Sequence, residues 1–485
     1  MFELFDQVSV GTVFLLCFSL FLVLLFEFIN GFHDTANAVA TVIYTQAMRP
    51  GHAVVLSGVF NFLGVLSGGL AVAYAIVNLL PIDLLTSGDS THLIAMIFAI
   101  VISAIIWNLG TWWLGLPASS SHTLIGAILG VGLTHALIKH ISAIHGVNWS
   151  KAADVGMSLL FSPFFGFVLA FVLLTGLNKF LPEFNIHQTP YLRNDVRGKK
   201  HPPFWTRFLL ILSAAGVSFA HGSNDGQKGV GLVMLALLCI LPHQFLIDVN
   251  ANKYEIERSY YAAQQIKNYV QINQNTIMTQ FPREAVSESK EFCQVADVEV
   301  YANGLQQVID ARPNLADMDN AERWQMRRHS LCLANAVKQI ADAPQTSSEQ
   351  NAYLLQLRQD LIKPVEYAPL WVIVAIASAL GFGTMIGWKR VVKTVGEGIS
   401  RSHMSYAQGV CAQMTAAISI AAANVFGLPV STTQILSSAV VGTAVANKSG
   451  VNTVTIRHII LAWLFTFPIA MILAGVLYFV MTLFI

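Results

Sequence analysis

Gly115-Leu-Pro-Ala-Ser-Ser-Ser-His-Thr-Leu124 recurs, with few changes, as Gly427-Leu-Pro-Val-Ser-Thr-Thr-Gln-Ile-Leu436. A second pair of related stretches, Asn30-Gly-Phe-His-Asp-Thr-Ala-Asn37 and His221-Gly-Ser-Asn-Asp-Gly-Gln-Lys228, follows an apolar segment in each half of the chain. A proline-containing motif with a run of Ser and Thr hydroxyls is hard to obtain twice by chance. We therefore expect two repeats of one structural unit.

The composition indicates that this unit lies in a membrane. Of the 485 residues, 54% are apolar and 11% are charged, whereas a soluble chain carries about 25% charged residues. About half of the charged residues lie between residues 243 and 366, so the rest is almost uncharged. A net charge of +1 argues against nucleic-acid binding, and a membrane barrel would alternate apolar and polar residues. We expect an all-α polytopic membrane protein with roughly ten to twelve membrane segments.

The charge distribution also divides the chain. We expect a first transmembrane repeat over 1–181, a basic loop over 182–204, the start of the second repeat over 205–242, a soluble insert over 243–366, and the remainder of the second repeat over 367–485. Some apolar stretches are too short or too polar for a simple span. We expect them to be broken or re-entrant helices: His33–Thr45, Ser119–Ile138, Gly229–Leu241 and Ser431–Ala446.

Basic residues in short loops predict the orientation. Such loops carry an excess of Lys and Arg on the cytoplasmic side, and basic clusters lie at 182–206 and 388–402. The insert then lies outside if 205–241 crosses the membrane once, and inside if it crosses twice. Cys293 and Cys332 in the insert could pair only in an oxidising compartment.

The repeated Gly-Leu-Pro motif suits an anion. Pro117 and Pro429 can end one helix and start another, and hydroxyls that follow them suit an N-cap at the positive end of a helix dipole. Such termini bind phosphate or carboxylate groups. Gly31, Gly222 and Gly226 would permit an unwound backbone with further N–H donors. The hydroxyl residues predicted to bind substrate are Ser119, Ser120, Ser121, Ser431, Thr432 and Thr433.

Two intramembrane carboxylates restrict the kind of anion. Aligning the second pair of stretches sets Asp34 opposite Asp225 and Asn37 opposite Lys228. A carboxylate accepts a hydrogen bond from a protonated oxyanion such as phosphate, whereas sulfate has no proton to donate. Because a charged side chain inside a membrane is energetically costly, we expect such a residue to have a function. Lys228 beside Asp225 is a candidate for proton coupling, because buried lysines and carboxylates shift their pKa readily.

The other polar residues of the repeats are assigned roles from the chemistry of their side chains. Asn37 and Asn224 are predicted substrate ligands, and Glu27 and His33 are predicted to take part in coupling together with Asp34, Asp225 and Lys228. Simpler roles stay open, namely helix capping by the aspartates, snorkelling of Lys228 and close helix packing at the hydroxyl residues. We expect no resident metal site and no cofactor. The predicted supporting residues are Asn108, His122, Asn424 and Gln434.

The motifs Gly31-Phe-His-Asp-Thr-Ala-Asn37 and Gly222-Ser-Asn-Asp-Gly226, with the two Gly-Leu-Pro stretches, resemble the signatures of the PiT family of inorganic phosphate transporters, in particular its bacterial low-affinity branch. The resemblance implies inverted repeats, phosphate bound by the Asp, Asn and Ser/Thr positions, and proton symport, often of a neutral divalent-metal phosphate. Members commonly carry Gly-Ala-Asn-Asp-x-x-Asn in both halves. Phe32-His33 and Lys228 depart from that pattern, which puts sodium coupling in doubt.

The expected function is secondary active transport of phosphate by alternating access in the cell inner membrane, and not an enzymatic reaction. Expected partners are phosphate, protons, a divalent metal bound to phosphate, the lipid bilayer and a second copy in a homodimer, without nucleic acid. A sulfate or other oxyanion permease and a sodium-coupled phosphate symporter are alternatives. A hydrolase built on Ser121 and His122 is disfavoured, because adjacent residues rarely present a nucleophile and a base to each other. A channel usually needs a ring of subunits.

Overall fold

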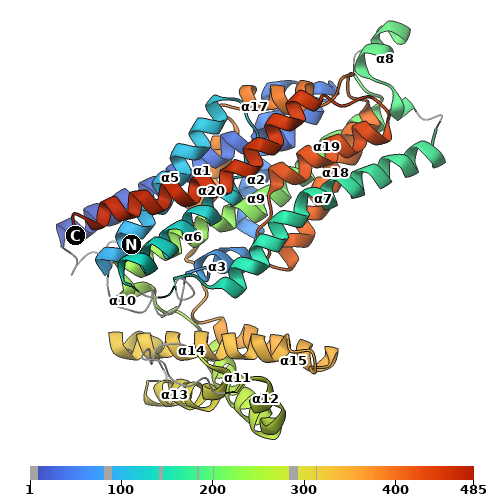
Figure 1. Ribbon diagram of the computed structural model, residues 1–485. Coiled ribbons are helices and arrows are strands. Elements are labelled where there is room, and N and C mark those ends of the chain that lie inside the picture. Colours follow the sequence, from blue (N-terminus) through green and yellow to red (C-terminus); the bar gives the residue numbers. More distant parts are fainter. Residues whose placement is uncertain are drawn as a thin grey trace. The chain divides into compact units, whose positions relative to one another are not determined.

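A computed structural model describes residues 9–80, 90–140, 142, 146–182, 185–199, 201–282, 293–312 and 314–485, without the side chains of Thr35, Asn37, Ser90 and Glu397. Within these residues the regular structure is helical, apart from one isolated bridge between Ser400 and Val451. The predicted all-α fold is confirmed. The chain forms two compact units, one of them built mainly from Leu237–Ala368 and the other from the two apolar parts of the chain (Figure 1).

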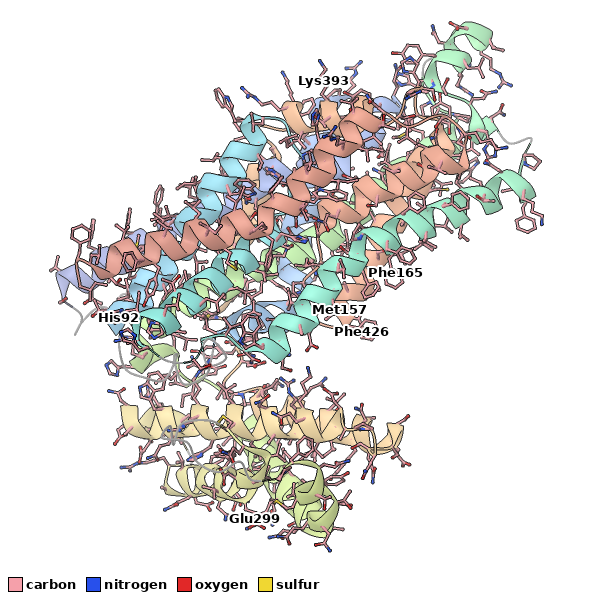
Figure 2. The ribbon with its side chains drawn as sticks, in the orientation of Figure 1. His92, Met157, Phe165, Glu299, Lys393 and Phe426 are labelled. Carbon is pink, nitrogen blue, oxygen red and sulfur yellow. A yellow bond between two sulfur atoms is a disulfide. The ribbon has the colours of Figure 1, made fainter. Side chains whose placement is uncertain are left out.

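The apolar unit contains long helices in both halves. Seven described helices are long and apolar enough to cross a membrane. The helices Leu370–Thr384 and Lys389–Gly396 meet at a bend of 56°, and they give an eighth span if they are counted together as one. Their outer surface carries large apolar side chains such as Met157 and Phe165 of α7, which project away from the unit (Figure 2). The first half comprises α1 (Val10–Tyr44), α2 (Pro50–Ser67), α3 (Ala71–Val77), α5 (Ser90–Trp113), α6 (Ser120–Ile138) and α7 (Trp149–Phe180). The second half comprises α8 (Pro190–Arg197), α9 (Phe204–Ile240), α16 (Leu370–Thr384), α17 (Lys389–Lys393), α18 (Tyr406–Val425), α19 (Thr432–Ala446) and α20 (Thr453–Thr482).

Two of the four predicted helix breaks are absent, because α1 and α9 run unbroken through the polar stretches. The expectation that His33–Thr45 and Gly229–Leu241 are separate broken helices is wrong. The glycines serve close helix packing instead of unwinding. A Cβ added to Gly31 would lie 2.8 Å from Thr384 N of α16, and one added to Gly222 would lie 2.7 Å from Asn61 Cα of α2.

The other two breaks lie at the Gly-Leu-Pro motifs, as predicted. Gly115 and Gly427 have φ of 68° and 63°, a left-handed conformation that favours glycine. The chain then passes through proline and starts a new helix, α6 at Ser120 and α19 at Thr432. These turns place the first residues of α6 and α19 inside the unit, where the Ser and Thr side chains are buried.

The two repeats contact each other through equivalent positions. Phe28 lies six residues before Asp34, and its backbone leaves room only for a glycine, Gly383, on α16. Phe219 lies six residues before Asp225, and its backbone likewise leaves room only for Gly64 on α2. In the same way α6 packs along α20 and α19 packs along α7 (Figure 1). Each half therefore completes its core with helices of the other half. The inverted orientation of the repeats stays a prediction.

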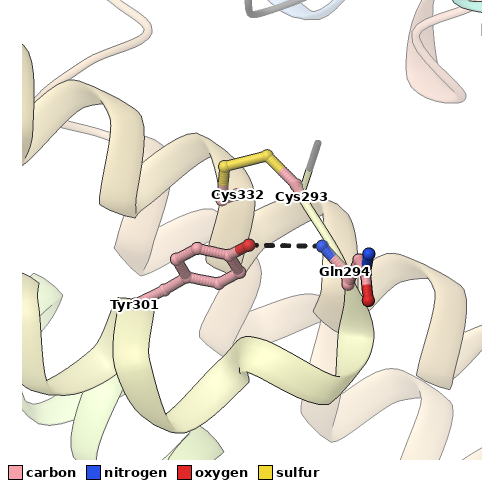
Figure 3. The surroundings of a disulfide bond; sticks show 4 residues. All are labelled: Cys293, Gln294, Tyr301 and Cys332. Atoms are coloured by element: carbon pink, nitrogen blue, oxygen red, sulfur yellow. Dashed lines mark hydrogen bonds between the residues drawn. A yellow bond between two sulfur atoms is a disulfide. The ribbon is translucent and has the colours of Figure 1, made fainter. Parts of the chain in front are cut away.

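The second unit is a small helical bundle with a disulfide. Cys293 and Cys332 are bonded, and beside them the backbone N–H of Gln294 donates to the Tyr301 hydroxyl at 3.2 Å (Figure 3). The buried Arg327 donates to the backbone oxygens of Leu246 and Val365, so it joins the two ends of the unit. Its helices are α10 (Pro242–Phe245), α11 (Lys253–Ile272), α12 (Gln274–Gln280), α13 (Val298–Ala311), α14 (Asn320–Ala341) and α15 (Ser348–Ile362).

Candidate functional site

Asp34 of α1 and Asp225 of α9 meet in the interior of the apolar unit. Ser120, in the first turn of α6, connects them: its Oγ lies 3.2 Å from Asp34 Oδ2 and 3.3 Å from Asp225 Oδ2. Both carboxylates are buried, at 2% and 0% exposure. A hydroxyl has one proton to donate, so Ser120 satisfies only one of the two carboxylates at a time. The repeated aspartates therefore form one site together with the start of a helix.

The second repeat contributes further donors. Thr433, in the first turn of α19, donates its hydroxyl to Asp34 Oδ1 at 2.8 Å. Lys228 Nζ donates to Asp225 Oδ1 at 2.7 Å and to Ser121 Oγ at 2.6 Å, and the lysine is 1% exposed. The N-terminal ends of two helices thus face the acid pair, where the positive ends of their dipoles favour negative charge.

Two histidines border the carboxylates. His33 Nδ1 lies 3.2 Å from Asp34 Oδ1, and its Nε2 lies 3.1 Å from the Thr111 hydroxyl oxygen. His221 Nε2 lies 3.7 Å from Asp34 Oδ2 and 3.5 Å from Asp225 Oδ2. The three acceptor atoms of Asp34, Asp225 and His221 lie within 4.8 Å of one another, a spacing that could accommodate a metal ion.

A hydrogen-bond chain fixes the tautomer of His221. Thr384 donates its hydroxyl proton to Leu380 O at 2.8 Å, so it accepts from Asn61 Nδ2 at 3.0 Å. Asn61 Oδ1 is then the acceptor for His221 Nδ1, 2.8 Å away, and Nδ1 carries a proton. If the ring is neutral, Nε2 presents a lone pair to two carboxylates. That arrangement requires a proton or a cation between them.

The buried charges of the site do not balance. Glu27 is fully buried beside them, and Asn30 Nδ2 lies 3.4 Å from both Glu27 Oε2 and Asp225 Oδ2. The site thus holds three buried carboxyl groups, of which Asp225 is paired with Lys228. Uncompensated buried charge costs several kcal/mol per ion, so protons or cations must neutralise part of this acid excess. The site therefore contains more acidic groups than its one lysine can neutralise.

The first residue of each hydroxyl triplet, Ser119 or Ser431, caps a helix. Ser119 Oγ accepts the backbone N–H of His122 at 3.2 Å and also lies 2.8 Å from its ring Nδ1. Ser431 Oγ accepts the backbone N–H of Gln434 at 3.2 Å. These bonds use helix N–H groups that we expected to be free for an anion. Ser120, Ser121 and Thr433 are the hydroxyls that reach Asp34 or Lys228, whereas Thr432 is buried without a recorded side-chain bond to them.

The asparagines predicted to bind or support the substrate make no recorded hydrogen bond to the two aspartates. Asn224 donates to Asn424 Oδ1 at 2.6 Å and to Leu428 O at 3.2 Å, so this pair joins α9 to the turn before α19. Asn108 is buried, and its amide has no hydrogen-bond partner in the part of the chain that the structure describes. The side chain of Asn37 lies outside the described residues.

The sequence reasoning missed several residues of the site. His221 and Asn30 both open their polar stretches and lie opposite each other in the repeat alignment, so the repeat itself could have indicated them. Asn61 and Thr111 belong to no motif, and nothing in the sequence indicates that they contact the histidines.

Two intertwined helical repeats with a buried acid pair between helix N-termini are typical of a membrane transporter. The phosphate transporter family profile matches residues 30–474. The chain is 47% identical over 492 residues to the low-affinity inorganic phosphate transporter PitA of Escherichia coli (strain K12), which covers 99% of both chains. PitB of the same strain is likewise 47% identical over 496 residues. The chain belongs to the phosphate transporter family.

More distant comparisons agree on the fold and the class. A probable low-affinity inorganic phosphate transporter of Bacillus subtilis (strain 168) is 26% identical and covers 95% of both chains. A solved structure, "The sodium-dependent phosphate transporter", is similar with a TM-score of 0.55 and 18% identity over 97% of this chain and all of its own. That similarity concerns the fold alone. The apolar helices and the bacterial relatives place the chain in the cell inner membrane as a multi-pass transporter, not an enzyme.

Proposed function

We propose that the chain carries inorganic phosphate into the cell together with protons, by alternating access around the Asp34–Asp225 site. The observation that carries this proposal is the buried acid pair, which only protons or cations can neutralise. A phosphate that retains a proton can donate O–H to a carboxylate and accept from Ser120, Thr433 or Lys228. Sulfate lacks the proton and would meet repulsion at the carboxylates.

Lys228 favours protons over sodium as the coupling ion. Its ammonium group lies 2.7 Å from Asp225, where a sodium ion would otherwise balance the carboxylate. His33 offers a proton carrier on the other aspartate, because its Nδ1 is within hydrogen-bond distance of Asp34. Transport would then require that protons enter this cluster with phosphate on one side and leave with it on the other.

A divalent metal can travel with the phosphate as part of the substrate. Asp34, His221 and Asp225 offer two carboxylate oxygens and one imidazole nitrogen, the ligands that divalent transition metals accept. The hydroxyls of Ser120 and Thr433 and the ammonium group of Lys228 lie on the same acid pair and would contact the phosphate oxygens. A neutral metal phosphate would thereby satisfy both the acid excess and the donors.

The insert belongs on the outer side of the membrane in this proposal. The helix α9 is continuous from Phe204 to Ile240, which supports one crossing between the basic loop and the insert. The paired Cys293 and Cys332 fit an oxidising compartment. The resemblance to the family suggests a homodimer as the working assembly, and we propose it on that ground alone.

Uptake by purified protein in proteoliposomes tests the proposed coupling. Radiolabelled phosphate uptake should follow an imposed pH gradient, remain unchanged when sodium replaces potassium, and resist excess sulfate. Uptake that requires a sodium gradient would replace the proton proposal with sodium symport. Equal competition by sulfate would identify a general oxyanion permease.

A further inference from the structure

The basic loop contains a buried arginine in an otherwise exposed helix. The helix α8 is capped by Thr189, whose Oγ1 accepts the Leu192 N–H at 3.2 Å, and it ends at Gly198. Arg193, near its middle, is 8% exposed, whereas Arg197, one turn later, is exposed. One face of this short helix therefore buries a charged side chain within the apolar unit.

Within the described residues, the guanidinium group of Arg193 has no hydrogen-bond or ion-pair partner. Its Nε and Nη1 atoms are buried and make no hydrogen bond, and Arg193 takes part in no ion pair among the residues that the structure describes. Asp195 lies on the same helix but is exposed. A buried, unpaired charge costs several kcal/mol, so a ligand that brings a counter-charge would stabilise this arrangement.

A second unpartnered polar group lies nearby. The hydroxyl of Tyr406, at the start of α18, is buried in a residue of 0% exposure and makes no hydrogen bond in the described part of the chain. The backbone N–H of Tyr406 donates to Gln188 O at 3.1 Å, so the chain entering α8 is held against the start of α18.

We propose that Arg193 and Tyr406 bind the phosphate group of an anionic ligand at a site separate from the Asp34–Asp225 pair. The unpartnered Nε and Nη1 atoms offer N–H donors to phosphate oxygens, and the tyrosine hydroxyl offers a further donor. The ligand supplies the negative charge that the described residues do not. The phosphate group can come from the headgroup of an anionic lipid or from free inorganic phosphate.

The surroundings of the site connect it to the transport machinery. Tyr191, Leu192 and Val196 of α8 expose apolar side chains, which suits a helix lying at a membrane surface among lipid headgroups. Tyr191 also stacks on His403, with ring centroids 3.8 Å apart, next to the start of α18. A ligand on Arg193 and Tyr406 would hold α8 and α18 together, and α18 leads into the turn before α19 and Thr433.

Thermal unfolding of the full-length protein in neutral detergent tests this site. The melting temperature is measured for wild type, Arg193→Gln and the matched exposed control Arg197→Gln. Three probes are titrated separately: short-chain phosphatidylglycerol, short-chain phosphatidylcholine and inorganic phosphate. We expect the wild type and Arg197→Gln to be stabilised, and Arg193→Gln to lose that increment. Loss confined to phosphatidylglycerol identifies a lipid headgroup, and loss confined to inorganic phosphate identifies free phosphate.

Two further outcomes keep the proposal falsifiable. The central site contributes equally to the phosphate response of all variants, so only the difference between wild type and Arg193→Gln counts. Equal responses of these two proteins to both anionic probes, or no response of the wild type, would overturn the proposal. If Arg193→Gln does not fold, Tyr406→Phe keeps the charge and should raise the half-saturating probe concentration by about tenfold. An unchanged value would equally overturn it.

Discussion

Lys228 Nζ lies 2.7 Å from Asp225 Oδ1, one helical turn apart on α9, and both side chains are buried. Asp34, the equivalent aspartate of the first repeat, instead contacts His33 of its own repeat and Thr433 of the second repeat. The two equivalent aspartates therefore have different partners. That asymmetry makes Lys228 the residue that most directly distinguishes proton coupling from sodium coupling.

The variant Lys228→Asn should therefore lower proton-driven uptake. It makes the second repeat resemble Asn37 of the first and removes the built-in positive charge beside Asp225. We expect proton-driven phosphate uptake to fall at least tenfold, which corresponds to about 1.4 kcal/mol for the lost charge-assisted contact. The exposed Lys179→Asn in α7 is the matched control and should behave as wild type. Proton-driven uptake that survives Lys228→Asn undiminished would show that Lys228 has no part in coupling.

Gly31→Ala and Gly222→Ala should each destabilise the protein, because the new methyl group would overlap backbone atoms of α16 or α2. Overpacking of this kind costs roughly 1–3 kcal/mol. The control is Gly176→Ala in α7, where an added Cβ meets no atom within 4 Å, and this change should be neutral or stabilising by up to about 1 kcal/mol. Melting temperatures in detergent measure the difference. If all three variants melt alike, the glycines do not serve helix packing.

The position of the insert can be read from its cysteines. A membrane-impermeant thiol reagent applied to intact spheroplasts should label Cys293 and Cys332 only after reduction, because they are paired and face outward in the proposed orientation. The Cys293→Ser/Cys332→Ser double variant measures background from Cys17, Cys239 and Cys411. Labelling that appears only after the membrane is permeabilised would place the insert inside and reverse the proposed orientation.

The repeat made much of the site predictable. It indicated that Asp34 and Asp225 are equivalent, and the prolines of the two Gly-Leu-Pro motifs indicated the helix breaks that begin at Gly115 and Gly427, where φ is positive. Local sequence carries such signals, because turn geometry depends on the residues within the turn. The repeat alignment also contained His221, although its role was not recognised.

Other features depend on contacts that are distant in sequence. Gly31 and Gly222 look alike whether they unwind a helix or admit a neighbouring one, and only the approach of α16 and α2 decides between the two. The role of Asn61 as the residue that orients His221 likewise follows from the packing of α2 on α9. Local patterns do not specify which helices will be neighbours.

Asp34→Asn and Asp225→Asn test the central claim most directly. Each substitution keeps the size of the side chain and removes one of the two carboxylates joined by Ser120. The measurement is initial phosphate uptake into proteoliposomes under an inward pH gradient, with equal amounts of inserted protein and with the exposed Asp154→Asn in α7 as control. We predict that both site variants lose proton-driven uptake while the control retains it. Normal uptake kinetics in either site variant would contradict the assignment of this acid pair as the transport site.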